Sequence, residues 1–138
     1  MKLVADANVL LSAVLGGRAS QVMGHSDIEE IFTTAVTFAE VQEYAVILAH
    51  KEKLPLDALL LAVAALPVSI VDAEVYEHSL DRARKLIGKR DPEDIEILAL
   101  ALHLRVALWS NDNDFEQTGV EWFTTAELLQ RLGISGKR

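Results

Sequence analysis

The chain alternates short apolar runs with longer stretches in which apolar residues recur every three or four positions. The short runs predict strands. The longer stretches predict helices, because side chains on a half-buried helix return to one face with that period. The expected strands cover residues 2–5, 28–33, 67–71, 106–109 and 120–123. The expected helices cover residues 8–15, 19–24, 35–53, 56–66, 73–87, 92–104 and 126–132.

Residues at the expected helix starts agree with these boundaries. Asp72 and Thr124 are predicted to cap the helices that follow them, since a side-chain oxygen can accept a hydrogen bond from the first turn. Asp91 is predicted to cap the next helix in the same way, with Pro92 in the first helical position, where its missing N–H is harmless.

Strands and helices alternate along the whole length, which is the pattern of an α/β fold. Parallel strands need long crossover connections, and these place helices over both faces of the sheet. We therefore expect one three-layer α/β domain over residues 1–138, with a parallel sheet of four or five strands between two helical layers. A length of 138 residues and a hydrophobic content of 51% suit a single domain with a substantial core.

Two of the predicted strands end abruptly at a carboxylate. Asp6 directly follows the first strand, and Asp112 comes shortly after the fourth, with Asp114 two residues later. Glu40 and Asp94 lie near the starts of two predicted helices. Ligands of an open parallel sheet bind beyond the carboxyl ends of its strands, so these acids can face one crevice.

Carboxylates that are brought together repel one another, and a hard divalent cation between them relieves that repulsion. The acids therefore predict a Mg²⁺ or Mn²⁺ site with one or two ions. Each acid also has an ordinary structural interpretation: Asp91 and Asp94 as helix caps, Glu40 as a solvated helix residue, and Asp112 with Asp114 as members of an Asx turn.

The composition narrows the range of functions. The formal charge of −8 argues against a general polyanion binder, and two divalent ions would offset at most four of these charges. The absence of cysteine excludes disulfides, thiolate metal sites and thiol nucleophiles. No signal-like segment opens the chain and no apolar run approaches the ~20 residues that span a membrane. We therefore expect a cytoplasmic protein without a membrane partner.

Taken together in their order and spacing, four motifs resemble those of the PIN-domain family of metal-dependent nucleases, and the resemblance covers essentially the whole chain. The motifs are Val4–Leu10, Glu40 within Thr37–Val41, Arg90–Asp94 leading into Leu98–Ala101, and Ser110–Phe115.

The resemblance implies roles for individual residues. The metal-site and catalytic acids would be Asp6, Glu40, Asp94 and Asp112, with Asp114 as a frequent fifth metal ligand. Asn8 and Ser110 match positions where a small polar residue supports the acids, and Asp91 is placed with them as a supporting residue. Serine at position 110 replaces the commoner threonine and keeps the hydroxyl.

The resemblance further implies cleavage of single-stranded RNA by water that a carboxylate-held Mg²⁺ or Mn²⁺ activates. Many members of the family are toxins of toxin–antitoxin pairs and others process RNA, and the sequence does not choose between these roles. The RNA backbone would need positive groups to hold it. The candidates are Arg84, Lys85, Lys89, Arg90 and Arg18, and the alternative for the first four is a solvated helix face paired with Glu74, Glu77 and Asp81.

Two other functions remain open. A non-catalytic PIN-like scaffold or RNA-binding module would keep the fold without turnover, although such a protein has no physical need for clustered carboxylates. A phosphatase that forms an aspartyl-phosphate at Asp6 would usually need an acid two residues later, where this chain has Asn8.

The helices expected at residues 35–53 and 56–66 carry more apolar surface than a small sheet can cover. This excess predicts a homodimer or higher homo-oligomer, or a bound antitoxin segment. The alternative is a thick helical layer in a monomer.

Overall fold

The computed structural model describes residues 1–88 and 92–134, and within them the strands form one five-stranded sheet. The strand order is β3-β2-β1-β4-β5, and every neighbouring pair is parallel. The prediction of a parallel sheet of four or five strands is therefore confirmed. The strands are β1 (Lys2–Ala5), β2 (Glu30–Thr34), β3 (Ser69–Val71), β4 (Ala107–Trp109) and β5 (Trp122–Phe123).

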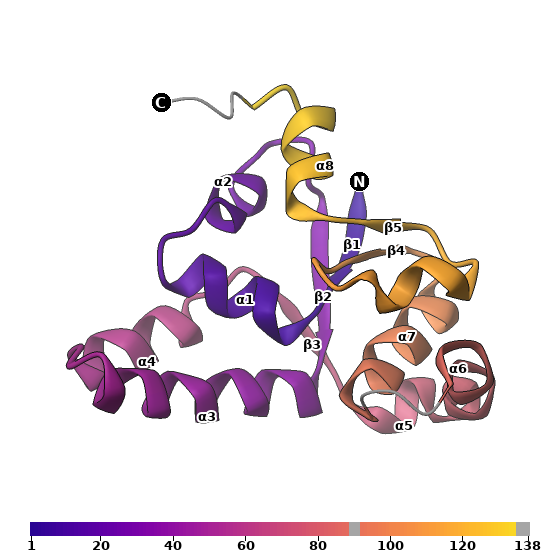
Figure 1. Cartoon of the computed structure of the whole chain (residues 1–138), viewed down its shortest axis with the longest axis horizontal. Coiled ribbons are helices and arrows are strands. Elements are labelled where there is room, and N and C mark those ends of the chain that lie inside the picture. Colours follow the sequence, from indigo (N-terminus) through magenta and orange to yellow (C-terminus); the bar gives the residue numbers. More distant parts are fainter. Residues whose placement is uncertain (89–91, 135–138) are drawn as a thin grey trace.

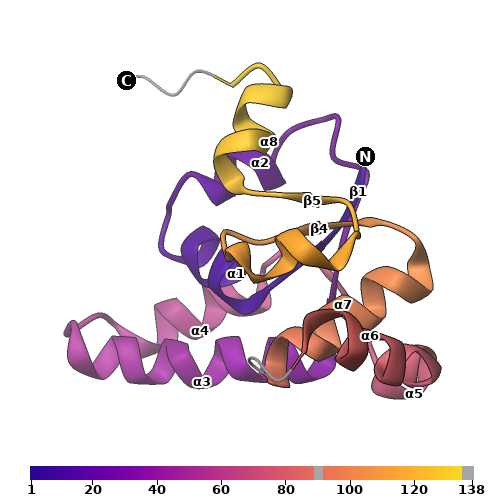
Figure 2. The same cartoon turned by 45° about the vertical axis from the view of Figure 1, so that its right-hand side comes forward.

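Helices cover both faces of this sheet, as the α/β pattern predicted (Figures 1 and 2). Helices α1, α3 and α4 lie on one side, while α5, α6 and α7 lie on the other. The helices are α1 (Ala7–Val14), α2 (Ala19–Met23), α3 (Ala35–Lys51), α4 (Leu56–Ala64), α5 (Ala73–Tyr76), α6 (Leu80–Ile87), α7 (Pro92–Leu104) and α8 (Thr125–Arg131), with 3-10 helices η1 (Glu77–Ser79) and η2 (Asn113–Thr118).

Alternate residues of each central strand enter different cores. Leu3 and Ala5 of β1 belong to the core under α1–α4 and α8, whereas Val4 between them belongs to the core under α5–α7. In β4, Trp109 and Leu108 divide in the same way. A strand with two buried faces is apolar without interruption, which is why these strands are recognisable as short apolar runs.

The segment predicted as one helix over residues 73–87 is instead α5, η1 and α6. The chain turns where Tyr76 is fully buried, and the Tyr76 hydroxyl donates a hydrogen bond to Glu96 Oε1 of α7 at 2.5 Å. Burial raises the pKa of the Tyr76 hydroxyl far above its ordinary range, and the hydrogen bond to Glu96 raises it further. This contact between distant segments interrupts a helix that local sequence favours.

Most other predicted boundaries agree to within about two residues. Asp72 precedes α5, but its side chain makes no capping hydrogen bond, so that part of the prediction is wrong. Thr124 caps α8 as expected, and it forms a capping box with Glu127. Asp91 lies outside the described residues, and Pro92 opens α7 as predicted. No helix within the described part of the chain is both long and apolar enough to cross a membrane.

The direction in which successive strands are added to the sheet reverses at β1. From β1 the chain adds β2 and then β3 on one side, and later β4 and β5 on the other. The carboxyl ends of β1 and β4 are therefore neighbours at the point where ligands bind in open α/β sheets. Ala5 pairs with Trp109 at this edge, so the residues after them, Asp6 and Ser110, emerge side by side.

Candidate active site

A cleft of about 110 Å³ opens at this edge of the sheet, and acidic side chains dominate its lining. Among the predicted residues, Asp6, Glu40, Asp94 and Asp112 all line it, and so does Asn8. Asp6, Glu40, Asp94 and Asp112 come from four separate segments: the end of β1, the second turn of α3, the first turn of α7 and the loop after β4. The fold therefore brings the four predicted catalytic acids into one cleft.

Asp6 is held rigidly at the base of this cleft. Its side chain is only 7% exposed, and Oδ1 accepts a hydrogen bond from the backbone N–H of Val9 at 2.9 Å. Helix α1 begins at Ala7, one residue earlier than predicted, so Asp6 caps it directly. The Asp6 side chain therefore both caps α1 and lines the cleft.

Ser110 connects two of the acids. Its fully buried hydroxyl donates to Asp6 Oδ2 and accepts a hydrogen bond from the backbone N–H of Asp112 at 3.0 Å. A hydroxyl suits this place because it can donate and accept at once. Ser110 therefore ties the loop after β4 to the end of β1.

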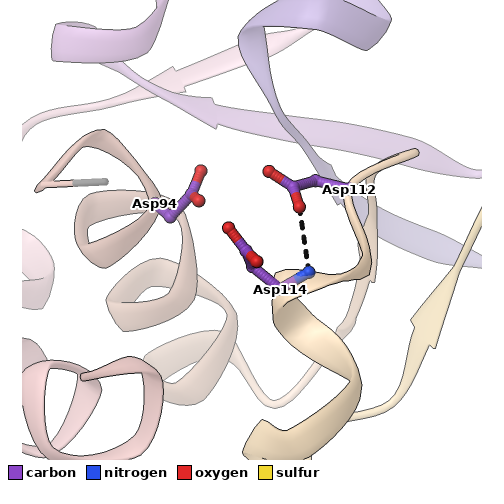
Figure 3. A group of neighbouring side chains, drawn as sticks. All are labelled: Asp94, Asp112 and Asp114. Carbon is purple, nitrogen blue, oxygen red and sulfur yellow. Dashed lines mark hydrogen bonds between the residues drawn. The ribbon is translucent and has the colours of Figure 1, made fainter. Parts of the chain in front are cut away.

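Three carboxylates approach one another most closely. Asp94 of α7, Asp112 and Asp114 of η2 point toward a common space in Figure 3, and each offers an oxygen within 4.8 Å of the others. Asp112 also accepts a hydrogen bond through Oδ1 from the backbone N–H of Asp114 at 2.9 Å. The Asx-turn interpretation is therefore correct for Asp112, and it coexists with the cluster, because the turn is what directs both carboxylates to the same side.

The lining of the cleft also includes residues that sequence reasoning did not single out for the site, among them Glu93 and Tyr44. Glu93 precedes Asp94 on α7, and Tyr44 follows Glu40 by four residues on α3, with 41% of its surface exposed. Residues four apart share one face of a helix, so the spacing from Glu40 was a signal for Tyr44. The position of Glu93 depends on how α7 docks against the sheet, which no local pattern reveals.

The electrostatics of the cleft favour a cation. Burial raises the pKa of the Asp6 carboxyl above its ordinary value, and the nearby negative charge of Asp112 raises it further, against the lowering effect of the hydrogen bonds from Ser110 and Val9. Among the described residues, no lysine, arginine or histidine lines the cleft. The donor set consists of carboxylate oxygens with an amide and a hydroxyl nearby, which fits a hard divalent cation such as Mg²⁺ or Mn²⁺.

Of the predicted RNA-contacting residues, Arg18, Arg84 and Lys85 lie outside this cleft. Arg84 and Lys85 are exposed on α6, where Arg84 pairs with Asp81 at 2.7 Å, as the solvated-face alternative expects. Arg18 precedes α2 and donates to Gln21 Oε1 at 3.3 Å. The predictions for Lys89, Arg90 and Asp91 lie outside the described residues.

The two aromatic residues that flank the acidic loop belong to the core. Trp109 and Phe115 are fully buried, and Trp109 donates from Nε1 to Thr125 Oγ1 at 3.0 Å. Neither ring is exposed for stacking on a base.

Solved structures of known proteins share this fold at low sequence identity. VapBC2 from Rickettsia felis, solved bound to a DNA fragment from its promoter, has 14% identity and a TM-score of 0.61, with 90% of this chain and 98% of that chain covered. A toxin–antitoxin complex from Klebsiella pneumoniae has 20% identity and a TM-score of 0.65, with coverage of 89% and 97%. VapC20 from Mycobacterium tuberculosis, described as a sarcin–ricin loop cleaving toxin, has 14% identity and a TM-score of 0.62, with coverage of 86% and 95%.

Among curated protein sequences, none matches this chain significantly. The family model of the PIN domain, in contrast, matches residues 4–133, which is nearly the whole chain. The match includes all five acids that line the cleft, and the fold agrees with that of the structural neighbours. The chain therefore belongs to the PIN-domain family.

Proposed function

We propose that the protein is a metal-dependent ribonuclease that hydrolyses phosphodiester bonds of single-stranded RNA in the acidic cleft. The observation that carries this proposal is the convergence of five carboxylates, those of Asp6, Glu40, Glu93, Asp94 and Asp112, on one small cleft at the point where the strand order reverses. Such a concentration of negative charge is costly without a cation, and a phosphate cannot approach it unless the charge is offset.

The residues that would hold the metal are Asp94, Asp112 and Asp114, with Asp6 and Glu40 on the same cleft. A bound divalent cation lowers the pKa of a coordinated water and offsets the negative charge that develops on the phosphate.

The protein contributes the placement of the carboxylates. The Asx turn directs Asp112 and Asp114, and Ser110 holds the backbone of Asp112 against Asp6. Asp6 is rigid because both of its carboxylate oxygens accept hydrogen bonds. A divalent cation in the cleft would favour its ionised form and would counteract the effect of burial on its pKa. These contacts keep the acids in position before any ligand arrives, which reduces the cost of ordering them on binding.

We also propose that the protein is the toxin of a toxin–antitoxin pair. The structural neighbours described as a toxin–antitoxin complex and as a sarcin–ricin loop cleaving toxin support this role. Apolar side chains on two adjacent helices support a protein partner: Ile47 of α3 is 57% exposed and Leu61 of α4 is 72% exposed. An exposed apolar surface of this kind is stabilised when a second copy of the chain or an antitoxin segment covers it.

The proposal is tested by incubating the full chain with a fluorescent single-stranded RNA and Mn²⁺ or Mg²⁺, with and without EDTA. We expect metal-dependent cleavage that Asp6→Asn and Asp112→Asn each reduce by at least about 100-fold, because metal ligands act together. Asp57→Asn is the matched control, since Asp57 is an exposed acid at the start of α4 outside the cleft. Circular dichroism verifies that every variant is folded.

Equal cleavage by Asp57→Asn and Asp112→Asn would contradict the assignment of the cleft. A non-catalytic scaffold is a second candidate function, and the acidic charge of −8 is the observation that favours it. A scaffold without a metal site would show no cleavage of any RNA and no thermal stabilisation by Mn²⁺.

A further inference from the structure

A second charged region lies at the opposite edge of the sheet, where the strands begin. Four basic residues line two adjoining hollows of about 340 and 330 Å³. Both hollows are lined by Arg105, Val106 and Glu121. Arg82 of α6 lines the first hollow, while Lys2 of β1 and Arg131 of α8 line the second. We call these four residues, Lys2, Arg82, Arg105 and Arg131, the basic edge. They come from four segments that are distant in sequence.

The acids near these cations lie mostly outside the two hollows: the N-terminal amine and, to a lesser extent, the charge of Lys2 lower the pKa of exposed Glu29, and Arg131 also lines a third hollow with Asp27 and Glu29. Within residues 1–88 and 92–134, none of the four belongs to an ion pair, whereas Arg84 is paired with Asp81. Glu121 is the one carboxylate among the described residues that line the two hollows. A surplus of positive charge in a chain of net charge −8 indicates an anionic ligand.

Arg105 occupies an unusual backbone position at the centre of the basic edge. Its φ is 59°, in the left-handed region that glycine adopts most easily. The backbone N–H of Arg105 donates to Ala101 O at 2.8 Å, the 5→1 bond of an αL helix cap, and the N–H of Val106 donates to the same oxygen at 3.3 Å, the 6→1 bond of a Schellman motif. The chain therefore keeps a long cationic side chain where glycine would be easier to accommodate.

Lys53 provides a direct comparison at the end of α3. Its φ is 55°, and the N–H of the next residue, Leu54, donates to Ala49 O at 2.9 Å. A basic residue near a helix C-terminus is favoured by the helix dipole at both places. Lys53, however, lies in neither hollow. Lys53 and Arg105 thus have the same left-handed backbone conformation and the same position relative to a helix dipole. They differ in that only Arg105 lines the two hollows.

We propose that the basic edge binds the phosphodiester backbone of RNA at a distance from the acidic cleft. This inference rests on the proposed function, because RNA is the polyanion that a ribonuclease must hold. The cleft itself attracts no phosphate without a cation, so affinity for the backbone has to come from elsewhere on the protein. A polynucleotide carries a charge on every nucleotide and can reach cations in both hollows, which a single small anion in one hollow cannot do.

The arrangement of the hollows suits this ligand. The Arg131 guanidinium lies 5.1 Å from the centre of the Phe123 ring, and this contact restrains the side chain where it lines the second hollow. Guanidinium groups bind phosphate in a bidentate manner, and three of the four cations are arginines. The basic edge therefore positions a bound strand, while the acidic cleft is the proposed place of cleavage.

The experiment measures binding of a fluorescein-labelled, 30-nucleotide single-stranded RNA by anisotropy, with the full chain carrying Asp6→Asn so that the RNA stays intact. In this background we compare Arg105→Gly with Lys53→Gly. Both variants place glycine at a left-handed position and both should fold. We expect Arg105→Gly to weaken binding about two- to fivefold and to lower the slope of log K against log salt by about 0.7. We expect Lys53→Gly to change neither.

Equal binding by the two glycine variants would overturn the inference. Equal competition by poly-glutamate of matched charge would also overturn it, because the site would then be one for acidic peptides. Cleavage of the same RNA by the wild-type chain with Mn²⁺ is measured in parallel. If the wild-type chain cleaves the RNA but Arg105→Gly binds it normally, only the proposed role of the basic edge is refuted. If Arg105→Gly weakens binding but the wild-type chain cleaves no RNA, only the proposed ribonuclease activity is refuted.

Discussion

Replacing Asp6 by asparagine is expected to stabilise the metal-free protein at pH 8 and to remove most of the stabilisation that Mn²⁺ provides. The carboxyl is only 7% exposed, and burial raises its pKa. Asparagine has nearly the same shape and can still accept the hydrogen bond from the Val9 N–H through Oδ1. The substitution therefore removes a buried charge with little change in packing.

The direction of the effect follows from proton linkage. Because folding raises the pKa of Asp6, the folded state holds this proton to higher pH than the unfolded chain does. The free energy of unfolding therefore falls as pH rises from the ordinary value of 3.8 through the folded pKa, and it stays reduced at higher pH. Asparagine does not titrate, so its advantage should be largest at pH 8 and should disappear below the ordinary pKa.

The magnitude is a balance of two contributions. Each pKa unit by which folding raises the carboxyl corresponds to about 1.4 kcal/mol at high pH. Against this, the Ser110 hydroxyl loses its carboxylate acceptor and has to accept from the asparagine amide instead, which costs about 1 kcal/mol. We expect the removal of the buried charge to outweigh this cost, so that the variant has the higher Tm in EDTA at pH 8.

The assay is thermal unfolding followed by circular dichroism in EDTA and in saturating Mn²⁺. At 100 times its Kd, Mn²⁺ should stabilise the wild-type chain by about 2.7 kcal/mol, or about 10 °C, and the Asp6→Asn variant by much less. The variant should thus be the more stable protein in EDTA at pH 8 and the less stable one in Mn²⁺. A variant that is less stable in EDTA at pH 8, or that responds to Mn²⁺ as the wild type does, would refute the reasoning.

Three other substitutions test separate parts of the structure. Ser110→Ala should lower the free energy of unfolding by about 1–3 kcal/mol in chemical denaturation, because the buried Asp6 carboxylate and the Asp112 N–H lose their partner, while Ser110→Thr should retain activity. Tyr44→Ala should raise KM for RNA severalfold with little change in kcat, since the exposed ring lines the mouth of the cleft and no acid is removed; a loss confined to kcat would argue against substrate contact. Leu61→Ser should change stability by less than about 0.5 kcal/mol but reduce the molar mass seen by light scattering, and an unchanged mass would exclude this face as a homodimer interface.

Much of the fold could be predicted because its local patterns are strong. The buried strands are uninterrupted apolar runs, and the helix starts carry recognisable signals such as Thr124 with Glu127. The break between α5 and α6 could not be predicted, because it depends on the burial of Tyr76 and its hydrogen bond to Glu96 on another helix. The left-handed position of Arg105 was equally hidden, since no glycine marks the turn between α7 and β4.

The sequence by itself determined which acids stand at strand ends and helix starts, because an apolar run and the carboxylate at which it stops are both visible within a few neighbouring residues. Only the tertiary structure decided that these acids share a cleft. Asp6 and Ser110 are 104 positions apart, and they meet because β1 pairs with β4 rather than with another strand. Strand order depends on how both helical layers pack over the whole sheet, and that packing free energy belongs to no local segment of the chain.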